Sequence, residues 1–169
     1  LIVTRNLEAI YCVDTAIRAV ARVIELGHDV ALRIAGSGPQ RESLQMLAKE
    51  LGVADRIVFE GRLGRAGMVA LYQSAHAMIN PASVDNMPNS VIEALACGVA
   101  VVSTDVGGVP FIVTHEETAL LVPARDEQAL ASAIVRLLQD AALADRLRRN
   151  GLTAVEQYTW ANVRQRWLE

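Results

Sequence analysis

The sequence is poor in the residues that build metal centres, disulfide frameworks and membrane spans. It has two cysteines, Cys12 and Cys97, far apart and in no zinc or redox spacing, so we expect reduced thiols. Its three histidines, His28, His76 and His115, are separated from one another and from any acidic cluster. No apolar run reaches the roughly 18 residues of a membrane span. We therefore expect a cytoplasmic protein with no bound metal, no transmembrane segment and no signal peptide.

Positive charge is also scarce, and almost none of it is lysine. Sixteen lysines and arginines face nineteen aspartates and glutamates, for a formal net charge of −3, and Lys49 is the only lysine. Proteins that coat nucleic acid or an anionic membrane are normally basic, so neither is an expected partner. Any cation that binds a phosphate must be an arginine unless Lys49 lies at the site.

Hydrophobic residues, by contrast, make up 52% of the 169 residues, which indicates a folded chain. Six short runs rich in Val and Ile indicate strands covered on both faces, at residues 1–4, 30–35, 57–59, 77–80, 99–103 and 119–122. Between them, apolar residues recur at helical intervals. This alternation predicts an α/β fold: a doubly wound, Rossmann-like, parallel six-stranded sheet with helices on both faces and further C-terminal helices.

The pattern has no internal repeat or flexible linker, so we expect residues 1–169 to form a single domain. The chain begins at Leu1 directly in a strand pattern, and we expect it to be a piece of a longer protein. In a doubly wound sheet, ligands bind at the carboxyl ends of the strands. The candidate loops are residues 5–10, 36–39, 61–64, 81–90 and 104–110.

Two of these loops are rich in glycine. Gly36-Ser37-Gly38-Pro39 follows a strand and opens a helix, whose N-terminus favours an anion, but it lacks the third glycine of the dinucleotide fingerprint. Gly107-Gly108-Val109-Pro110 follows the fifth strand and precedes a short helix. Both permit close approach of a ligand to the backbone, but taken alone each is more typical of an ordinary tight turn.

The most informative segment runs from residue 80 to residue 93. Pro88 disfavours helix at Met87 and suits the start of a new helix, so Asp85 is expected on a loop and Glu93 inside that helix. Glu93 is also the only charged residue between positions 91 and 102. Arg5, just beyond the first strand, is expected at the same edge of the sheet, although it fits a lone surface arginine as well.

The backbone N–H groups near Asn89, Ser90 and Val91 are expected to point outward from the first turn of that helix. Such a loop and helix can hold a nucleotide sugar, with the loop acid on sugar hydroxyls, the amides on the diphosphate and the helix acid on the ribose. The alternative is a capping box, in which Ser90 and Glu93 cap their own helix.

Taken in order, these segments resemble the C-terminal, donor-binding domain of glycosyltransferase family 4 (group 1), retaining enzymes of the two-domain GT-B fold. The resemblance covers nearly the whole chain and rests on six segments: Thr4-Arg5-Asn6-Leu7, Ile34 to Pro39, Val58-Phe59-Glu60-Gly61, Asn80-Pro81-Ala82-Ser83, Glu93 to Val102, and Gly107 to Pro110. It implies metal-independent transfer of a hexosyl unit from a nucleotide diphosphate sugar, with UDP or GDP expected, to an acceptor hydroxyl.

The resemblance also implies a role for each matching residue. Glu93 would hold the ribose, Asp85 would contact the donor sugar, and Arg5 would neutralise the leaving diphosphate. These three are the expected catalytic residues. The residues expected to line the nucleotide sugar are Gly36, Gly38, Arg62, Asn86, Met87, Pro88, Asn89, Ser90 and Glu93. An N-terminal domain outside this sequence would bind the acceptor and make any membrane contact, so the isolated chain is expected to be inactive.

The sequence departs from the family pattern at three places. Asp85 stands where the family usually has the longer glutamate, Tyr11 and Cys12 occupy a region that often holds a lysine, and Phe111 replaces a common glutamate. Two other interpretations remain open: a nucleotide-sugar 2-epimerase on the same fold, and a non-catalytic, flavodoxin-like regulatory module. The epimerase needs additional acids and a histidine, and the module needs an acidic cluster and a lysine near the last strand.

Overall fold

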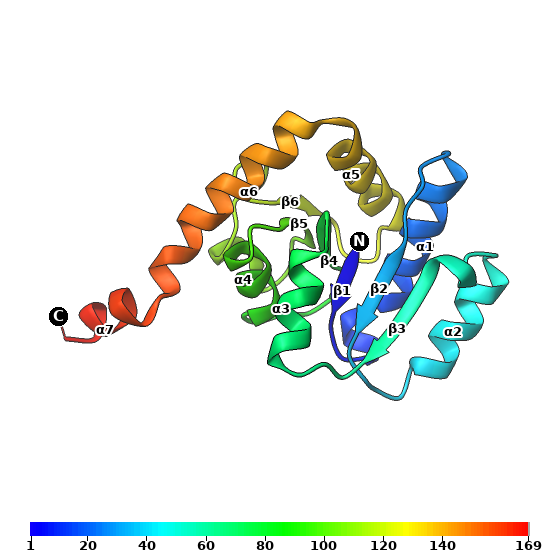
Figure 1. Cartoon of the computed structure of the whole chain (residues 1–169), viewed down its shortest axis with the longest axis horizontal. Helices are drawn as coiled ribbons and strands as arrows, with labels where there is room; N and C mark the ends of the chain where they lie inside the picture. Colours follow the sequence, from blue (N-terminus) through cyan, green and yellow to red (C-terminus); the bar gives the residue numbers. More distant parts are fainter. Residues whose placement is uncertain (169) are drawn as a thin grey trace.

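Six short strands form one parallel sheet in the computed structural model, which describes residues 1–168 (Figure 1). The strands are β1 (Ile2–Thr4), β2 (Leu32–Ala35), β3 (Ile57–Gly61), β4 (Ala77–Asn80), β5 (Ala100–Thr104) and β6 (Leu120–Val122). Their order across the sheet is β3-β2-β1-β4-β5-β6. The predicted doubly wound parallel sheet is confirmed.

Helices cover both faces of the sheet, which explains why the strands are apolar at nearly every position. In β4, Ala77 and Ile79 face one buried cluster while Met78, between them, faces the other. One face is covered by α1 (Val13–Glu25), α2 (Arg41–Glu50), α5 (Glu127–Gln139) and the first part of α6 (Ala141–Val155). The other is covered by α3 (Arg65–Gln73) and α4 (Asn89–Ala96), as Figure 1 shows.

The connection between β5 and β6 differs from the predicted pattern of a helix after every strand. It contains only a 3₁₀ turn, η3 (Val109–Phe111), with Pro110 near its start. The preceding glycines hold this connection against another loop: a Cβ on Gly108 would lie 1.5 Å from the carbonyl oxygen of Asn86. The two glycines therefore allow the chain to approach its own backbone.

The C-terminal part is helical, as expected. Asp126 and Asp140 cap α5 and α6, each accepting a hydrogen bond of 2.8 Å from a backbone N–H of the first turn. After a 3₁₀ turn, η4 (Glu156–Tyr158), α7 (Trp160–Leu168) lies at the far end of α6, away from the sheet (Figure 1). Trp160 and Trp167 on α7 are 73% and 85% exposed. No helix within residues 1–168 is both long and apolar enough to cross a membrane.

Winding of the chain reverses between β1 and β4. These two strands are neighbours in the sheet, yet β1 continues to β2 on one side and β4 continues to β5 on the other. The loops that leave their carboxyl ends diverge toward opposite faces, which leaves a crevice at this edge. The crevice is therefore the expected position for a ligand.

Candidate functional site

A cavity of about 630 Å³ lies at this point, between the loop after β1 and the loop that leads from β4 into α4. Its lining joins segments that are about eighty residues apart in the sequence. It is lined by Thr4, Arg5, Asn6, Ile10, Tyr11, Val84, Asp85, Asn86, Met87, Asn89, Ser90 and Glu93. The lining includes all three predicted catalytic residues, Arg5, Asp85 and Glu93. It also includes four other residues that were predicted to line the nucleotide sugar: Asn86, Met87, Asn89 and Ser90.

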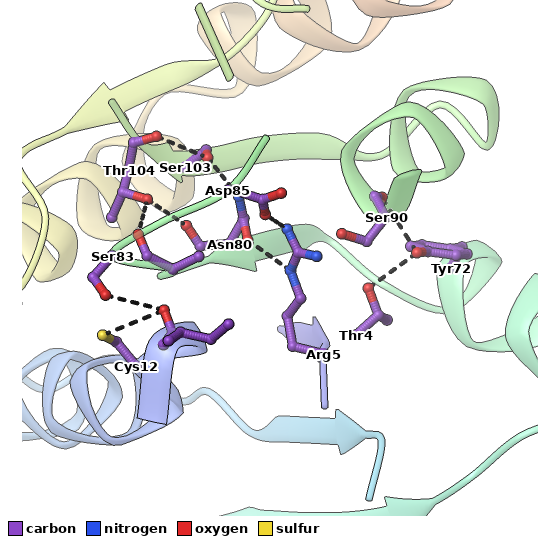
Figure 2. A network of polar contacts seen from close by, with 12 residues as sticks. Thr4, Arg5, Cys12, Tyr72, Asn80, Ser83, Asp85, Ser90, Ser103 and Thr104 are labelled. Atoms are coloured by element: carbon purple, nitrogen blue, oxygen red, sulfur yellow. Dashed lines mark hydrogen bonds and ion pairs between the residues drawn. The ribbon is translucent and has the colours of Figure 1, made fainter. Parts of the chain in front are cut away.

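Arg5 and Asp85 form an ion pair at the base of this cavity (Figure 2). Both side chains are largely buried, at 11% and 8% exposed. The Arg5 Nε–H also donates to Asn80 Oδ1 at 2.9 Å, and the guanidinium lies 5.1 Å from the centre of the Tyr11 ring. Burial lowers the pKa of Arg5, while Tyr11 and Tyr72 oppose that shift. The Arg5 guanidinium is therefore held in place by several contacts and shares its charge with Asp85.

A polar network behind this pair fixes the loop that carries Asp85. The Asn80 amide donates to the Ser103 hydroxyl at 3.0 Å, and the Thr104 hydroxyl donates to the carbonyl of Ala82 at 2.6 Å (Figure 2). The backbone N–H of Gly108 donates to the carbonyl of Asp85 at 2.8 Å. Because most of these groups are buried and paired, the loop has a defined conformation in which Asp85 points toward Arg5.

The N-terminus of α4 faces the cavity without a side-chain cap. Pro88 is the N-cap residue and is buried rather than part of the lining. Within residues 1–168, the backbone N–H groups of Asn89 and Ser90 have no hydrogen-bond partner, and neither does the buried Ser90 hydroxyl. The predicted outward amide of Val91 is wrong, because that N–H donates to the carbonyl of Pro88 at 3.0 Å. Uncapped amides at a helix start favour an anion.

Glu93 lies in the second turn of α4 and lines the same cavity. Its apolar neighbours Val91, Ala94 and Leu95 are buried against the sheet, whereas Glu93 is exposed. The capping-box alternative is wrong: Glu93 Oε2 accepts a hydrogen bond of 2.9 Å from the Tyr72 hydroxyl. The carboxylate therefore faces the cavity rather than its own helix.

Tyr72 is one residue of this site that the sequence interpretation missed, and Tyr11 in the cavity lining is another. Tyr72 lies on α3, is 2% exposed, and contacts Thr4, Ser90 and Glu93 through its hydroxyl. One signal for it was available in the sequence. A tyrosine on the buried side of a helix needs a partner for its hydroxyl, and such a partner is polar.

Gly36 and Arg62 lie in a second cavity of about 200 Å³ that adjoins the first. The two cavities share Thr4, Arg5 and Asn6. Gly36 must be glycine for a local reason, because a Cβ there would lie 1.9 Å from the carbonyl oxygen of Arg5. Gly38, also predicted to bind the nucleotide, lines neither cavity and packs against the backbone of Leu7. Its close approach is again to the chain itself.

Ile10 also belongs to the lining of the main cavity. It lies in the 3₁₀ turn η1 (Ala9–Tyr11) and is 47% exposed at the main cavity.

Within the part of the chain that the structure describes, no three His, Cys, Asp or Glu side chains are grouped to hold a metal ion. The positive side chain that lines the main cavity is Arg5.

Comparison with known proteins points to one family. The family model described as "Glycosyl transferases group 1" matches residues 1–140. A D-inositol 3-phosphate glycosyltransferase of Nocardia farcinica is 34% identical over 166 residues, covering 92% of this chain and 36% of the relative.

Solved structures show the same fold. The sucrose-phosphate synthase of Thermosynechococcus elongatus is 30% identical, with a TM-score of 0.89 over 99% of this chain and 43% of that protein. Anabaena Alr3699/HepE, solved in complex with UDP-glucose, is 20% identical, with a TM-score of 0.86 over 92% of this chain and 43% of that protein. The chain thus spans about two-fifths of the length of these relatives.

Proposed function

The chain belongs to the group 1 glycosyltransferase family, and from this premise we propose that it is the donor-binding, C-terminal domain of a retaining enzyme. The donor is a nucleotide diphosphate sugar, and the transferred group is a hexosyl unit. The observation that carries the proposal is the main cavity at the switch point of the sheet. There a buried arginine and two carboxylates meet helix amides that have no hydrogen-bond partner among residues 1–168.

The diphosphate is assigned to the positive side of the cavity. Arg5 supplies a fixed charge, and the start of α4 supplies N–H groups together with the unpaired hydroxyl of Ser90. Aligned amides and a guanidinium are the donors that phosphate oxygens accept best. Because these groups are held before a ligand arrives, they can stabilise the charge that develops on the leaving diphosphate.

The two carboxylates are assigned to hydroxyl groups of the donor. Glu93, exposed in the cavity, accepts hydrogen bonds from the ribose, and Asp85, on the loop, accepts from the donor sugar. The second assignment depends on the ion pair with Arg5. Aspartate is one methylene shorter than glutamate, and its carboxylate is drawn toward the guanidinium. The diphosphate therefore competes with Asp85 for the charge of Arg5.

In the proposed reaction, the bond between the anomeric carbon and the diphosphate oxygen breaks, and the acceptor hydroxyl oxygen forms the new bond with the same anomeric configuration. The departing diphosphate oxygen carries away the electron pair of the broken bond and takes up the proton that the acceptor hydroxyl loses. The acceptor is bound by the rest of the enzyme, because this chain corresponds to about two-fifths of its relatives. The 169 residues alone are expected to bind nucleotide and to transfer no sugar; measurable turnover by the purified chain would contradict this.

Calorimetric titration of the chain with UDP, GDP and ADP tests the proposal. We expect one nucleotide to bind more tightly than the others, and Glu93→Ala to weaken it about 10- to 100-fold, as loss of hydrogen bonds to a charged group predicts. Glu50→Gln, at an exposed position on α2, is the matched control and should leave affinity unchanged. Absence of binding at millimolar concentration would overturn the proposal and favour a non-catalytic module.

A further inference from the structure

One buried hydroxyl group connects three elements at the edge of the main cavity. The Tyr72 hydroxyl lies 3.0 Å from Thr4 Oγ1 on β1, 3.2 Å from the carbonyl oxygen of Ser90 and 2.9 Å from Glu93 Oε2, the last two on α4. The ring itself is packed in the apolar cluster beneath α4. Phenylalanine would fill the same space, so packing alone does not account for the hydroxyl.

The number of hydrogens determines how these contacts are used. A tyrosine hydroxyl has one hydrogen to donate, and here two acceptors compete for it, the Ser90 carbonyl and the Glu93 carboxylate. The carboxylate oxygen is both closer and charged, so it takes the hydrogen. The Thr4 hydroxyl then donates to the Tyr72 oxygen. The result is a row of hydrogen bonds that runs from Thr4 through Tyr72 to Glu93, in which each hydrogen bond strengthens the next.

These hydrogen bonds restrain the Glu93 side chain, which would otherwise be free to rotate. Glu93 is exposed, and glutamate loses considerable rotamer entropy when it is fixed. Tyr72 holds Oε2, whereas Oε1 has no hydrogen-bond partner in the described part of the protein. One carboxylate oxygen is therefore fixed by the protein and the other is left for a group in the cavity.

We propose that Tyr72 is a positioning residue, which orients Glu93 so that its second oxygen accepts from a ribose hydroxyl of the bound nucleotide. This inference rests on the proposed function. The hydroxyl is suited to the task over the whole physiological pH range, because burial raises the pKa of Tyr72 well above its ordinary value. The hydrogen bond with Thr4 opposes this shift, and the charge of Glu93 adds to it. Tyr72 therefore remains a neutral donor and never a competing anion.

The test compares two nucleotides that differ only in the ribose. UDP and 2′,3′-dideoxy-UDP are titrated calorimetrically into the 169-residue chain and into Tyr72→Phe; the guanosine pair replaces them if the chain selects GDP. We expect Tyr72→Phe to weaken UDP about tenfold, the order of one hydrogen bond, and to change dideoxy-UDP affinity by less than about twofold. In Glu93→Ala, adding Tyr72→Phe should cause no further loss of UDP affinity.

Controls separate positioning from a general structural effect. Tyr158→Phe removes a hydroxyl that bonds the Phe111 carbonyl at 3.4 Å outside the main cavity, and it should change neither affinity. Thr4→Val, which removes the donor to Tyr72, should weaken UDP about threefold without affecting dideoxy-UDP. If Tyr72→Phe does not fold, the Thr4→Val variant replaces it in this comparison.

Three outcomes overturn the inference. Equal weakening of both nucleotides by Tyr72→Phe would show a structural role alone. A wild-type chain that binds UDP and dideoxy-UDP equally would show that no protein group senses the ribose hydroxyls, while leaving the donor site itself intact. A wild-type chain that binds neither would refute the proposed function together with this inference.

Discussion

Asp85 and Glu93 line the same cavity, yet the protein holds the two carboxylates in opposite ways. Asp85 is buried, and its partner is the guanidinium of Arg5. Glu93 is exposed, and its partner is the neutral hydroxyl of Tyr72. A buried carboxylate requires a compensating charge, whereas an exposed one is compensated by water until a ligand arrives.

This difference separates two kinds of acid within one site. In the absence of a ligand, Asp85 is largely committed to Arg5 and contributes to the stability of the loop after β4. Glu93 is oriented but keeps one oxygen available. The sequence places Asp85 on a loop and Glu93 in a helix, and the structure adds the difference in burial and in partner.

The largest expected effect comes from removing the cation of the buried pair. Arg5→Met leaves the Asp85 charge buried without a partner, so we expect the free energy of unfolding to fall by about 3 kcal/mol. Urea denaturation measures this. Arg18→Met is the matched control, because Arg18 lies 3.9 Å from Glu127 in an exposed pair, and such pairs contribute less than about 1 kcal/mol.

Adding Asp85→Asn to the Arg5→Met variant removes the uncompensated charge and should restore most of the lost stability. If Arg5→Met proves as stable as the Arg18→Met control, Arg5 does not compensate the buried charge of Asp85. The contrast between the two carboxylates would then have no energetic basis.

Neutralising each acid should change UDP affinity by a smaller amount, and in opposite directions for Asp85 and Glu93. Asp85→Asn releases the charge of Arg5, so we expect UDP, which carries no donor sugar, to bind about threefold more tightly. Glu93→Gln should weaken UDP instead, because it replaces a charged acceptor. Calorimetric titration of both variants measures the two changes. Weakening of UDP by both substitutions would contradict the competition between Asp85 and the diphosphate for Arg5.

The smallest expected effect concerns divalent cations. Both carboxylates are assigned to partners other than a metal, and Arg5 with the α4 amides is assigned the diphosphate. Because fixed protein donors are assigned to the diphosphate, removal of divalent cations with EDTA should change UDP affinity by less than about twofold. Titrations with and without added Mg²⁺ measure this. Loss of binding in EDTA, restored by Mg²⁺, would contradict the metal-independent interpretation.

The sheet could be predicted because its strands are short and mostly apolar, and β1, β4 and β5 are buried at every position. Residues 77–80 were predicted as a strand and are observed as β4 with the same bounds. The placement of Asp85 on a loop and Glu93 in a helix also followed from local chemistry, since Pro88 marks the start of α4. These features depend on neighbouring residues in the chain, which a sequence displays directly.

Other features depend on contacts between distant segments and could not be predicted in this way. The glycines at positions 36 and 108 indicate close backbone approach, but a sequence does not show whether a ligand or the chain itself approaches; here it is the chain. The partner of Glu93 is Tyr72, 21 positions earlier on another helix. The pairing of Arg5 with Asp85 likewise joins loops that only the sheet order brings together.

The position of α7 has a practical consequence for spectroscopy. Both tryptophans of the chain lie on this helix, exposed and away from the sheet (Figure 1). Tryptophan fluorescence will therefore report on the solvent around α7. Its intensity and emission maximum should change little when a nucleotide binds in the cavity. Tyr11, whose ring lies against Arg5 in the cavity lining, is the position at which an introduced indole would give an optical signal of occupancy.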